Sequence, residues 1–315
     1  MVKRALLIGA NYTATPVNKL NGCIDDIVNI HNMLIDAYAY EDSNIVMLRD
    51  DNPVPSKLPT KANILANLAS ILSVSSPADE VWVHYSGHGS QVKDANGDEI
   101  DRLDEMIVPC DYPRAGFITD DELFNVIAKS KCRLLLFFDS CNSGTVGDLQ
   151  YSVNYANGVY YRSTNNNKAI QNPNVIMMSG CKDNQTSADA YDNFAKQAVG
   201  AFTSALITTL RTYQHNIDIK NLYGSVCNLL KSAKFSQVPV LSFSTLNPEY
   251  KFARSISTST IQPKVVSVVN VSNPTKSILP NFNMSNIIST QSNSVNTLNP
   301  VTRSRSSTKM KMRLI

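Results

Sequence analysis

A histidine and a cysteine each follow an apolar run of the kind that forms a buried strand. His88 comes after VWVHYSG at 81–87, and Cys141 comes after LLLFFDS at 134–140. Ligands bind at the carboxyl ends of the strands in open α/β sheets. If both strands run parallel in one sheet, the imidazole and the thiol emerge at the same edge. Such a pair could perform nucleophilic catalysis, with His88 as general base for Cys141.

The neighbours of Cys141 favour this interpretation over a packing role. A lone free cysteine is more often a small buried hydrophobe than a nucleophile. Here, however, the polar and flexible residues Asn-Ser-Gly follow at once, whereas a core cysteine is expected among apolar side chains. The six cysteines form no CxxC pair, which favours a reduced, intracellular setting. His84, in the middle of its strand, is predicted to be packed rather than catalytic.

Short apolar runs alternate with stretches of helical period, which predicts an α/β protein with a mainly parallel central sheet flanked by helices. The expected strands are Ala5–Ile8, Asn44–Leu48, Glu80–Tyr85, Met106–Val108, Arg133–Phe138, Val175–Ser179 and Val240–Phe243. The expected helices cover 24–38, a segment capped by Thr60 and running to Leu72, 121–129, 200–212 and 219–232.

Two polar, Asn-rich stretches interrupt this order and are predicted to be a loop, 150–173, and a tail, 256–315. The tail holds seven Lys or Arg and no Asp or Glu, so an acidic body carries a basic extension. We expect the tail to be disordered, with binding to a membrane surface, nucleic acid or a partner as alternatives. No segment approaches the roughly 20 apolar residues of a membrane span, and the start lacks a signal peptide's apolar stretch. A soluble, cytoplasmic protein is therefore expected.

Several blocks in this order resemble the metacaspases, a family of caspase relatives, over roughly residues 4–250. The blocks are ALLIGANY at 5–12, LNGCIDDI at 20–27, HYSGHGSQ at 84–91, DANGDEIDRLDEMIVPCD at 94–111, ITDDEL at 118–123, FFDSCNSGT at 137–145 and MMSGCKDNQTSADA at 177–190. The resemblance implies a caspase-like three-layer sandwich over 1–255. It divides this domain into a p20-like part, 1–150, the loop, and a p10-like part, 174–255.

The resemblance also implies a cysteine endopeptidase with a His88 and Cys141 dyad and a thioester acyl-enzyme. A thiol with a pKa near 8.5 is mostly protonated at neutral pH, so Cys141 needs a base. The oxyanion would be held by the N–H groups of Gly89 and Cys141. Glycines on both sides of His88 are expected to leave room for the substrate backbone. Many relatives carry His after the nucleophile, where this chain has Asn142, and the dyad does not depend on that position.

The resemblance implies cleavage after Arg or Lys, and hence an acidic pocket. The positions that match the family's pocket are Asp26 and Asp139, with Cys23 and Ser86 on its wall. A buried carboxylate pair would need a cation to offset its desolvation, and the substrate's side chain would supply it. The alternative for Asp139 is a strand-end carboxylate that caps a turn.

Calcium is the cofactor that the resemblance implies. The segment DANGDEIDRLDE at 94–105 does not fit an EF-hand, because Glu99 stands where the loop needs Gly, and strands rather than helices are expected on either side. The positions that match the metacaspase calcium site are Asp104, Asp120, Asp121 and Asp148. Hard carboxylate oxygens suit Ca²⁺. The alternative is solvated loop charges or, for Asp120, a helix N-cap.

The remaining expectations concern regulation and partners. No Pro-rich or zinc-finger segment precedes the first strand, which indicates a compact, type I-like arrangement. Self-cleavage at Arg162 or Lys168 within the 150–173 loop is expected, since polar, mobile stretches are suited to cutting. The expected partners are protein or peptide substrates, with no nucleic acid, and the protein is expected to be a monomer. A catalytically silent scaffold and a calcium-responsive interaction module remain as alternatives.

Overall fold

The computed structural model describes residues 1–93, 103–140, 149–156, 159–164, 169–180, 189–192 and 197–255. The tail at 256–315 lies outside these residues, so its predicted disorder and its separation from the rest of the chain stay predictions. None of the helices in the described segments is long and apolar enough to cross a membrane.

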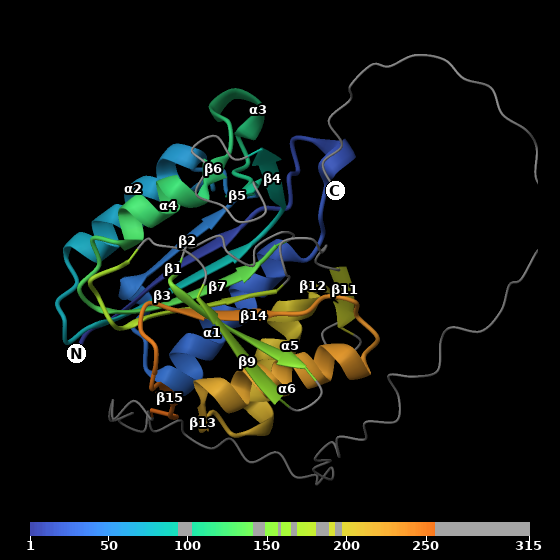
Figure 1. Cartoon of the computed structure of the whole chain (residues 1–315). Helices are drawn as coiled ribbons and strands as arrows, with labels where there is room; N and C mark the ends of the chain where they lie inside the picture. The colour runs from blue at the N-terminus through green and yellow to red at the C-terminus, as the bar shows by residue number, and fades with distance from the viewer. Residues whose placement is uncertain are drawn as a thin grey trace, which may run out of the picture. The chain divides into compact units, whose positions relative to one another are not determined.

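An eight-stranded sheet forms the centre of the described domain (Figure 1). Its first five strands in spatial order are parallel, and the last three are antiparallel to their neighbours. In that order they are β2 (Ile45–Arg49), β1 (Lys3–Gly9), β3 (Glu80–Ser86), β7 (Arg133–Asp139), β10 (Val175–Ser179), β14 (Val240–Phe243), β8 (Tyr151–Ala156) and β9 (Val159–Thr164). The predicted mainly parallel sheet is confirmed.

Helices cover both faces of this sheet and complete the three layers (Figure 1). One face carries α1 (Cys23–Tyr38), α5 (Ala201–Thr212) and α6 (Ile219–Ser232), and the other carries α2 (Lys61–Ser73) and α4 (Asp120–Ile127). Alternate strand residues feed the two cores, because successive side chains of a strand point to opposite faces. Leu7 and Phe137 belong to the first core, and Leu6 and Leu136 to the second.

Smaller elements lie around the central sheet. Met106 belongs to a separate antiparallel sheet of β4 (Gly89–Lys93), β5 (Leu103–Ile107) and β6 (Ile118–Thr119), not to the central sheet. Two further pairs are β11 (Asp189–Asp192) with β12 (Gln197–Gly200), and β13 (Ile217–Asp218) with β15 (Lys251–Phe252). The short helices are η1 (Pro16–Asn18), η2 (Asp42–Asn44), η3 (Pro55–Lys57) and α3 (Tyr112–Ala115).

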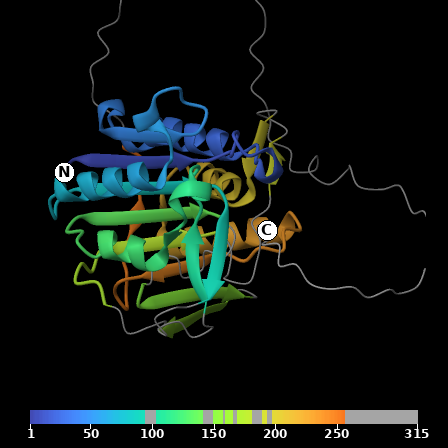
Figure 2. The same cartoon turned by 90° about the horizontal axis from the view of Figure 1, so that it is seen from above.

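The prediction of a loop over 150–173 is wrong for half of its length. Residues Tyr151–Ala156 and Val159–Thr164 form the antiparallel hairpin β8–β9, which extends the central sheet. Figure 2 shows this hairpin, in green, at the sheet edge opposite the blue N-terminal elements. The sequence did contain a signal for it, since Asn-Gly at 157–158 separates two runs rich in Tyr and Val. The high content of Asn concealed that signal.

Candidate active site

The strands that precede His88 and Cys141 are neighbours and run parallel. Ser86 at the end of β3 is paired with Asp139 at the end of β7. Beyond the strands, the N–H of Gly87 donates to the carbonyl oxygen of Asp139 over 3.2 Å. His88 and Cys141 therefore each follow a paired residue by two positions, at one edge of the sheet. Cys141 itself lies outside the described residues, so the distance between thiol and imidazole stays untested.

The ring of His88 is half-buried and has a defined orientation. Its Nε2 lies 2.8 Å from the carbonyl oxygen of Asn18. Because a carbonyl only accepts hydrogen bonds, Nε2 carries the proton and Nδ1 is the nitrogen with a lone pair. The ring of Tyr12 packs against the imidazole, with centroids 4.7 Å apart. Asn18 is in turn tied to Tyr112, whose Oη accepts from its Nδ2.

Two buried tyrosines also hold the backbone of His88. Its N–H donates to Oη of Tyr12 over 2.9 Å, and its carbonyl accepts from Oη of Tyr85 over 2.7 Å. A Cβ at Gly87 would lie 2.6 Å from Oη of Tyr85 and 3.0 Å from Oη of Tyr12. Gly87 is therefore required by the two tyrosine side chains, and the expected room for a substrate stays a prediction.

Asp26 and Asp139, which we call the pocket pair, come together from α1 and β7. Both are buried, with 1% and 4% of their surface exposed. Each approaches Gly200, the residue before α5, so closely that a Cβ there would overlap Oδ2 of Asp139 and lie 2.7 Å from Oδ2 of Asp26. Gly200 is therefore required by the close approach of the two carboxylates.

The start of α5 supplies hydrogen bonds to both members of the pocket pair. The N–H of Gly200 donates to Oδ1 and Oδ2 of Asp26 over 2.9 and 3.0 Å, and the hydroxyl of Ser86 donates to Oδ2 over 2.6 Å. Oδ2 of Asp139 accepts from both the N–H and the hydroxyl of Thr203, each over 2.8 Å. Helix N-termini favour negative charge. The expectation that the pair needs a cation is thus too strong, because these donors already offset part of the desolvation.

The alternative for Asp139, a cap of its own turn, stays a prediction, because residues 141–148 lie outside the described residues. The carboxylate does accept the N–H of Thr203 in the first turn of α5, a helix more than sixty residues further along the chain. Cys23, expected on the wall, is buried in the first turn of α1, one helical turn before Asp26. Its N–H donates to the side chain of Asn11 over 3.0 Å. The four positions expected to form the substrate pocket therefore belong to α1, β3 and β7, with α5 as an addition.

The residues expected to bind calcium are only partly within the described residues. Asp148 lies outside them, as does the segment 94–102, which is flanked by the paired strands β4 and β5 as expected. Asp120, 2% exposed, accepts the N–H of Glu105 through Oδ2 over 3.0 Å. This bond places the start of α4 beside β5, which contains Asp104. We call Asp104, Glu105, Asp120 and Asp121 the β5–α4 acidic set.

Details of this set correct two expectations. Thr119, not Asp120, is the N-cap of α4: its hydroxyl accepts from the N–H of Glu122, and the Glu122 carboxylate accepts from the N–H of Thr119, each over 3.2 Å. The sequence analysis also missed Glu105, a buried carboxylate that accepts from the side chain of Gln91 over 3.0 Å. The donors have the oxygen chemistry that Ca²⁺ requires. Among the described residues, no three His, Cys, Asp or Glu side chains gather closely enough to hold a metal.

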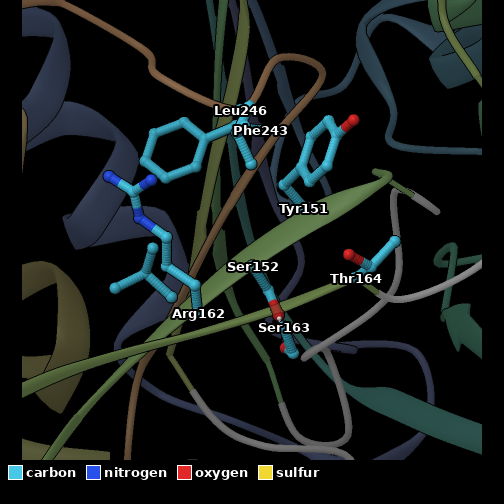
Figure 3. Close-up of a pocket in the computed structure, with 8 residues that line it drawn as sticks. Tyr151, Ser152, Arg162, Ser163, Thr164, Phe243 and Leu246 are labelled. Atoms are coloured by element: carbon cyan, nitrogen blue, oxygen red, sulfur yellow. Dashed lines mark hydrogen bonds between the residues drawn. The ribbon is translucent and has the colours of Figure 1, made fainter.

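Arg162, one of the two expected self-cleavage positions, lies in a paired strand rather than in a loop. It belongs to β9, opposite Val153 of β8, and its guanidinium donates to the side chain of Asn247 over 3.0 Å. Figure 3 shows its side chain beside Phe243, at a hollow of about 100 Å³. Cleavage there would require β9 to leave the sheet. Lys168 lies outside the described residues.

The fold and the candidate site define a class, the caspase-like α/β proteins, and comparison with known proteins gives the family. A family model described as the metacaspase, peptidase C14 domain matches residues 3–150. Metacaspase-1 of Mycosarcoma maydis is 35% identical, over 77% of this chain and 70% of the relative. Metacaspase-1 of Kluyveromyces lactis is 36% identical, over 77% of this chain and 66% of the relative. The chain belongs to the metacaspase family.

The matches cover only part of the length of some of these relatives. The chain spans 66% and 62% of the lengths of the metacaspases from Kluyveromyces lactis and Cryptococcus neoformans, so the activity of a whole metacaspase is a proposal for this chain. Among solved structures, a protein from Geobacter sulfurreducens aligns with a TM-score of 0.56 and 23% identity, over 79% of this chain and 96% of that one. That likeness supports the fold alone.

Proposed function

We propose that the protein is a cysteine endopeptidase that cleaves after Arg or Lys, with Cys141 as nucleophile and His88 as general base. The observation that supports it most is the register of β3 and β7. The Gly87 to Asp139 hydrogen bond joins the ends of the two strands that precede the proposed dyad, at the kind of sheet edge where ligands bind in open α/β folds. Membership of the metacaspase family agrees with this reaction.

The reaction follows from the proton positions on His88. The Cys141 thiol gives its proton to Nδ1, because Nε2 already donates to Asn18. The thiolate then attacks the scissile carbonyl carbon, and the N–H groups of Gly89 and Cys141 stabilise the oxyanion. Nδ1 returns the proton to the leaving amine as the C–N bond breaks, which leaves a thioester. Water hydrolyses the thioester with His88 again as base.

The proposed preference for Arg or Lys depends on the pocket pair. Both carboxylates are buried within hydrogen-bond networks, so they present negative charge where water screens it weakly. A guanidinium can bind a carboxylate with two parallel hydrogen bonds, and an ammonium binds as a point charge. An aspartate side chain in the substrate would be repelled. The geometry of the described residues is compatible with either basic residue.

Calcium activation belongs to the same proposal and depends on the β5–α4 acidic set together with Asp148. When bound, Ca²⁺ would neutralise carboxylates that repel one another. Asp120 and Asp121 occupy the first turn of α4, and Asp104 lies on the adjacent β5. For self-processing, Lys168 is the more suitable position, because Arg162 is held in β9.

The setting that we propose is a reducing one, with the protein acting as a monomer in the cytoplasm on protein substrates. Four cysteines among the described residues are free thiols: Cys23, Cys110, Cys132 and Cys227. Burial raises the pKa of Cys110 to about 12 and that of Cys132 to about 11, so neither is a reactive thiolate.

The proposal is tested with matched fluorogenic peptides that carry Arg, Lys or Asp before the cleaved bond. Each peptide is incubated with wild type and with Cys141→Ala, in calcium and in chelator. We expect cleavage of the Arg and Lys peptides in calcium by wild type alone. Preference for Asp would overturn the pocket assignment, and indifference to chelator would overturn the metal assignment. Activity retained by Cys141→Ala would overturn the nucleophile, and no activity on any peptide would favour a silent scaffold.

A further inference from the structure

A second histidine, His84 in β3, is buried behind the candidate pocket and has no role in the proposed reaction. Its ring is 0% exposed and lies nearly parallel to that of Phe137, with centroids 6.3 Å apart. Its Nε2 lies 3.0 Å from Oγ1 of Thr203, the residue of α5 that donates to Asp139. The two residues are 119 positions apart in the chain and meet only through the fold.

The protons of this chain of contacts have one consistent arrangement. The hydroxyl of Thr203 has a single proton, which it donates to Oδ2 of Asp139. Toward His84 that oxygen is therefore an acceptor, and Nε2 of His84 must be the donor. Hydrogen bonds thus run in one direction, from His84 to Thr203 and from Thr203 to Asp139.

The arrangement leaves a cost that packing does not explain. With the proton on Nε2, the buried Nδ1 of His84 has no hydrogen-bond partner among the described residues. A buried acceptor without a partner destabilises a fold, and a phenyl ring of similar shape would avoid the cost. Burial also lowers the pKa of His84 to about 3, so the ring is neutral and acts as a donor rather than as a charge. The one polar contact of this buried ring among the described residues is the hydrogen bond to Thr203, which indicates that this bond is the reason for a polar ring here.

We propose that Thr203 is a specificity-determining positioning residue, which fixes the Asp139 carboxylate for a guanidinium, and that His84 holds the Thr203 hydroxyl in the required rotamer. The inference depends on the proposed cleavage after Arg or Lys. Two bonds from one residue to Oδ2 fix the plane of the carboxylate. A guanidinium needs that fixed plane for two parallel bonds, whereas an ammonium is less sensitive to it. Thr203 therefore favours Arg over Lys.

The experiment compares three variants with peptides that carry Arg or Lys. Thr203→Val keeps the shape and the backbone bond but removes the hydroxyl, and Thr203→Ser restores the hydroxyl. Thr209→Val, at another buried threonine of α5, is the matched control for stability. We expect Thr203→Val to raise KM for the Arg peptide about tenfold and for the Lys peptide about twofold, with kcat little changed. Thr203→Ser should restore most of the Arg preference.

His84→Phe provides a second measurement that leaves the pocket itself untouched. We expect it to raise KM for the Arg peptide about threefold, and to add nothing when combined with Thr203→Val, because both changes remove the same oriented hydroxyl. If Thr203→Val does not fold, as judged by circular dichroism against Thr209→Val, His84→Phe decides the question.

The outcomes separate this inference from the function on which it depends. If wild type cleaves the Arg peptide while Thr203→Val and His84→Phe leave the ratio of Arg to Lys cleavage unchanged, the positioning role is wrong and the peptidase stands. If wild type cleaves neither basic peptide, the proposed function is wrong, and the inference is overturned with it.

Discussion

The pocket pair and the β5–α4 acidic set are both acidic, but they differ in how the chain brings their carboxylates together. Asp26 and Asp139 reach one glycine from separate elements and are supplied with N–H and hydroxyl donors by α5 and Ser86. The β5–α4 acidic set instead comes from two segments that are close in the chain, β5 and the first turn of α4, where Oδ2 of Asp120 accepts the N–H of Glu105. We therefore expect the pocket pair to be held by the protein's own donors, whereas the proposed calcium site would be completed by the metal.

This contrast allows substrate preference and activation to be tested separately, although both contribute to the measured activity. Substrate preference should depend on hydrogen bonds within the protein and be insensitive to metal. Activation should depend on the metal and be insensitive to the pocket. Each of the following changes is directed at one side of the comparison and leaves the other as an internal control.

The largest effect is expected for Gly200→Ala, which removes the space that the pocket pair requires. The added methyl group would overlap the Asp139 carboxylate and crowd Asp26, so one or both must shift. A displacement of about 1 Å costs about 100-fold in rate, and we expect kcat/KM for the Arg peptide to fall by that factor. Calcium should still stabilise the Gly200→Ala variant, as measured by thermal melting with and without calcium.

The matched control is Gly224→Ala in α6, where the methyl group would lie 2.6 Å from the terminal hydroxyl of the half-exposed Tyr160. That side chain can move, so we expect kcat/KM to change less than about twofold. Full activity in Gly200→Ala would show that the close approach of the two carboxylates is not needed for cleavage.

A crossed pair of charge removals distinguishes the two acidic sites directly. At a calcium concentration of about 100 times its Kd, a bound ion should stabilise wild type by about 2.7 kcal/mol. Asp120→Asn should lose most of this stabilisation and keep its preference for Arg over Asp peptides at saturating calcium. Asp139→Asn should keep the stabilisation and lose the preference. Melting with and without chelator, together with peptide kinetics, checks both; the reverse pattern would exchange the roles of the two sites.

The lowered pKa of His84, which lies behind the pocket pair, predicts that the stability of the fold depends on pH. Its folded pKa of about 3 lies below the ordinary value of 6.5, so between these values the unfolded chain binds the extra proton. Stability is therefore lost as the pH falls through this window. From pH 7 to pH 5 the contribution is about 2 kcal/mol. Urea unfolding should show wild type losing about that much more than His84→Phe, and equal losses would mean that His84 is not neutral in the fold.

The sequence predicts some parts of the fold better than others. The strands and helices of the three layers were predictable because buried strands and amphipathic helices leave periodic patterns. The hairpin β8–β9 was missed because Asn-rich composition suggested a loop, although Asn157-Gly158 is a hairpin signal. Arg162 was for this reason assigned to a mobile segment.

Within the site, the acidic residues were predicted and their supports were not. The resemblance pointed to Asp26 and Asp139. Gly200 and Thr203 act through contacts that the local sequence does not predict. Gly200 stands directly before an apolar helical run, and the helix predicted over 200–212 does begin there, but the sequence does not show that two carboxylates approach this residue. No signal marks Thr203, because a threonine in a helix is unremarkable until Asp139 is placed beside it.

The smallest effect is expected for the cap of α4, on the metal side of the comparison. Thr119→Ala removes the hydroxyl that accepts from Glu122, at a cost of about 1 kcal/mol. Because the first turn then frays where Asp120 and Asp121 lie, the calcium concentration for half-activation should rise about threefold. The Arg preference at saturating calcium should not change, since the pocket pair has its own donors.

Asp218→Ala is the control for a general loss of stability. The Asp218 carboxylate caps α6 by accepting the N–H groups of Lys220 and Asn221 over 3.1 and 3.0 Å, so its loss should cost a similar stability. Because α6 packs on the opposite face of the sheet from α4, this change should leave the calcium titration unchanged. If both variants shift the titration equally, general destabilisation explains the result. If only Thr119→Ala shifts it, the order of the first turn of α4 is part of the metal response.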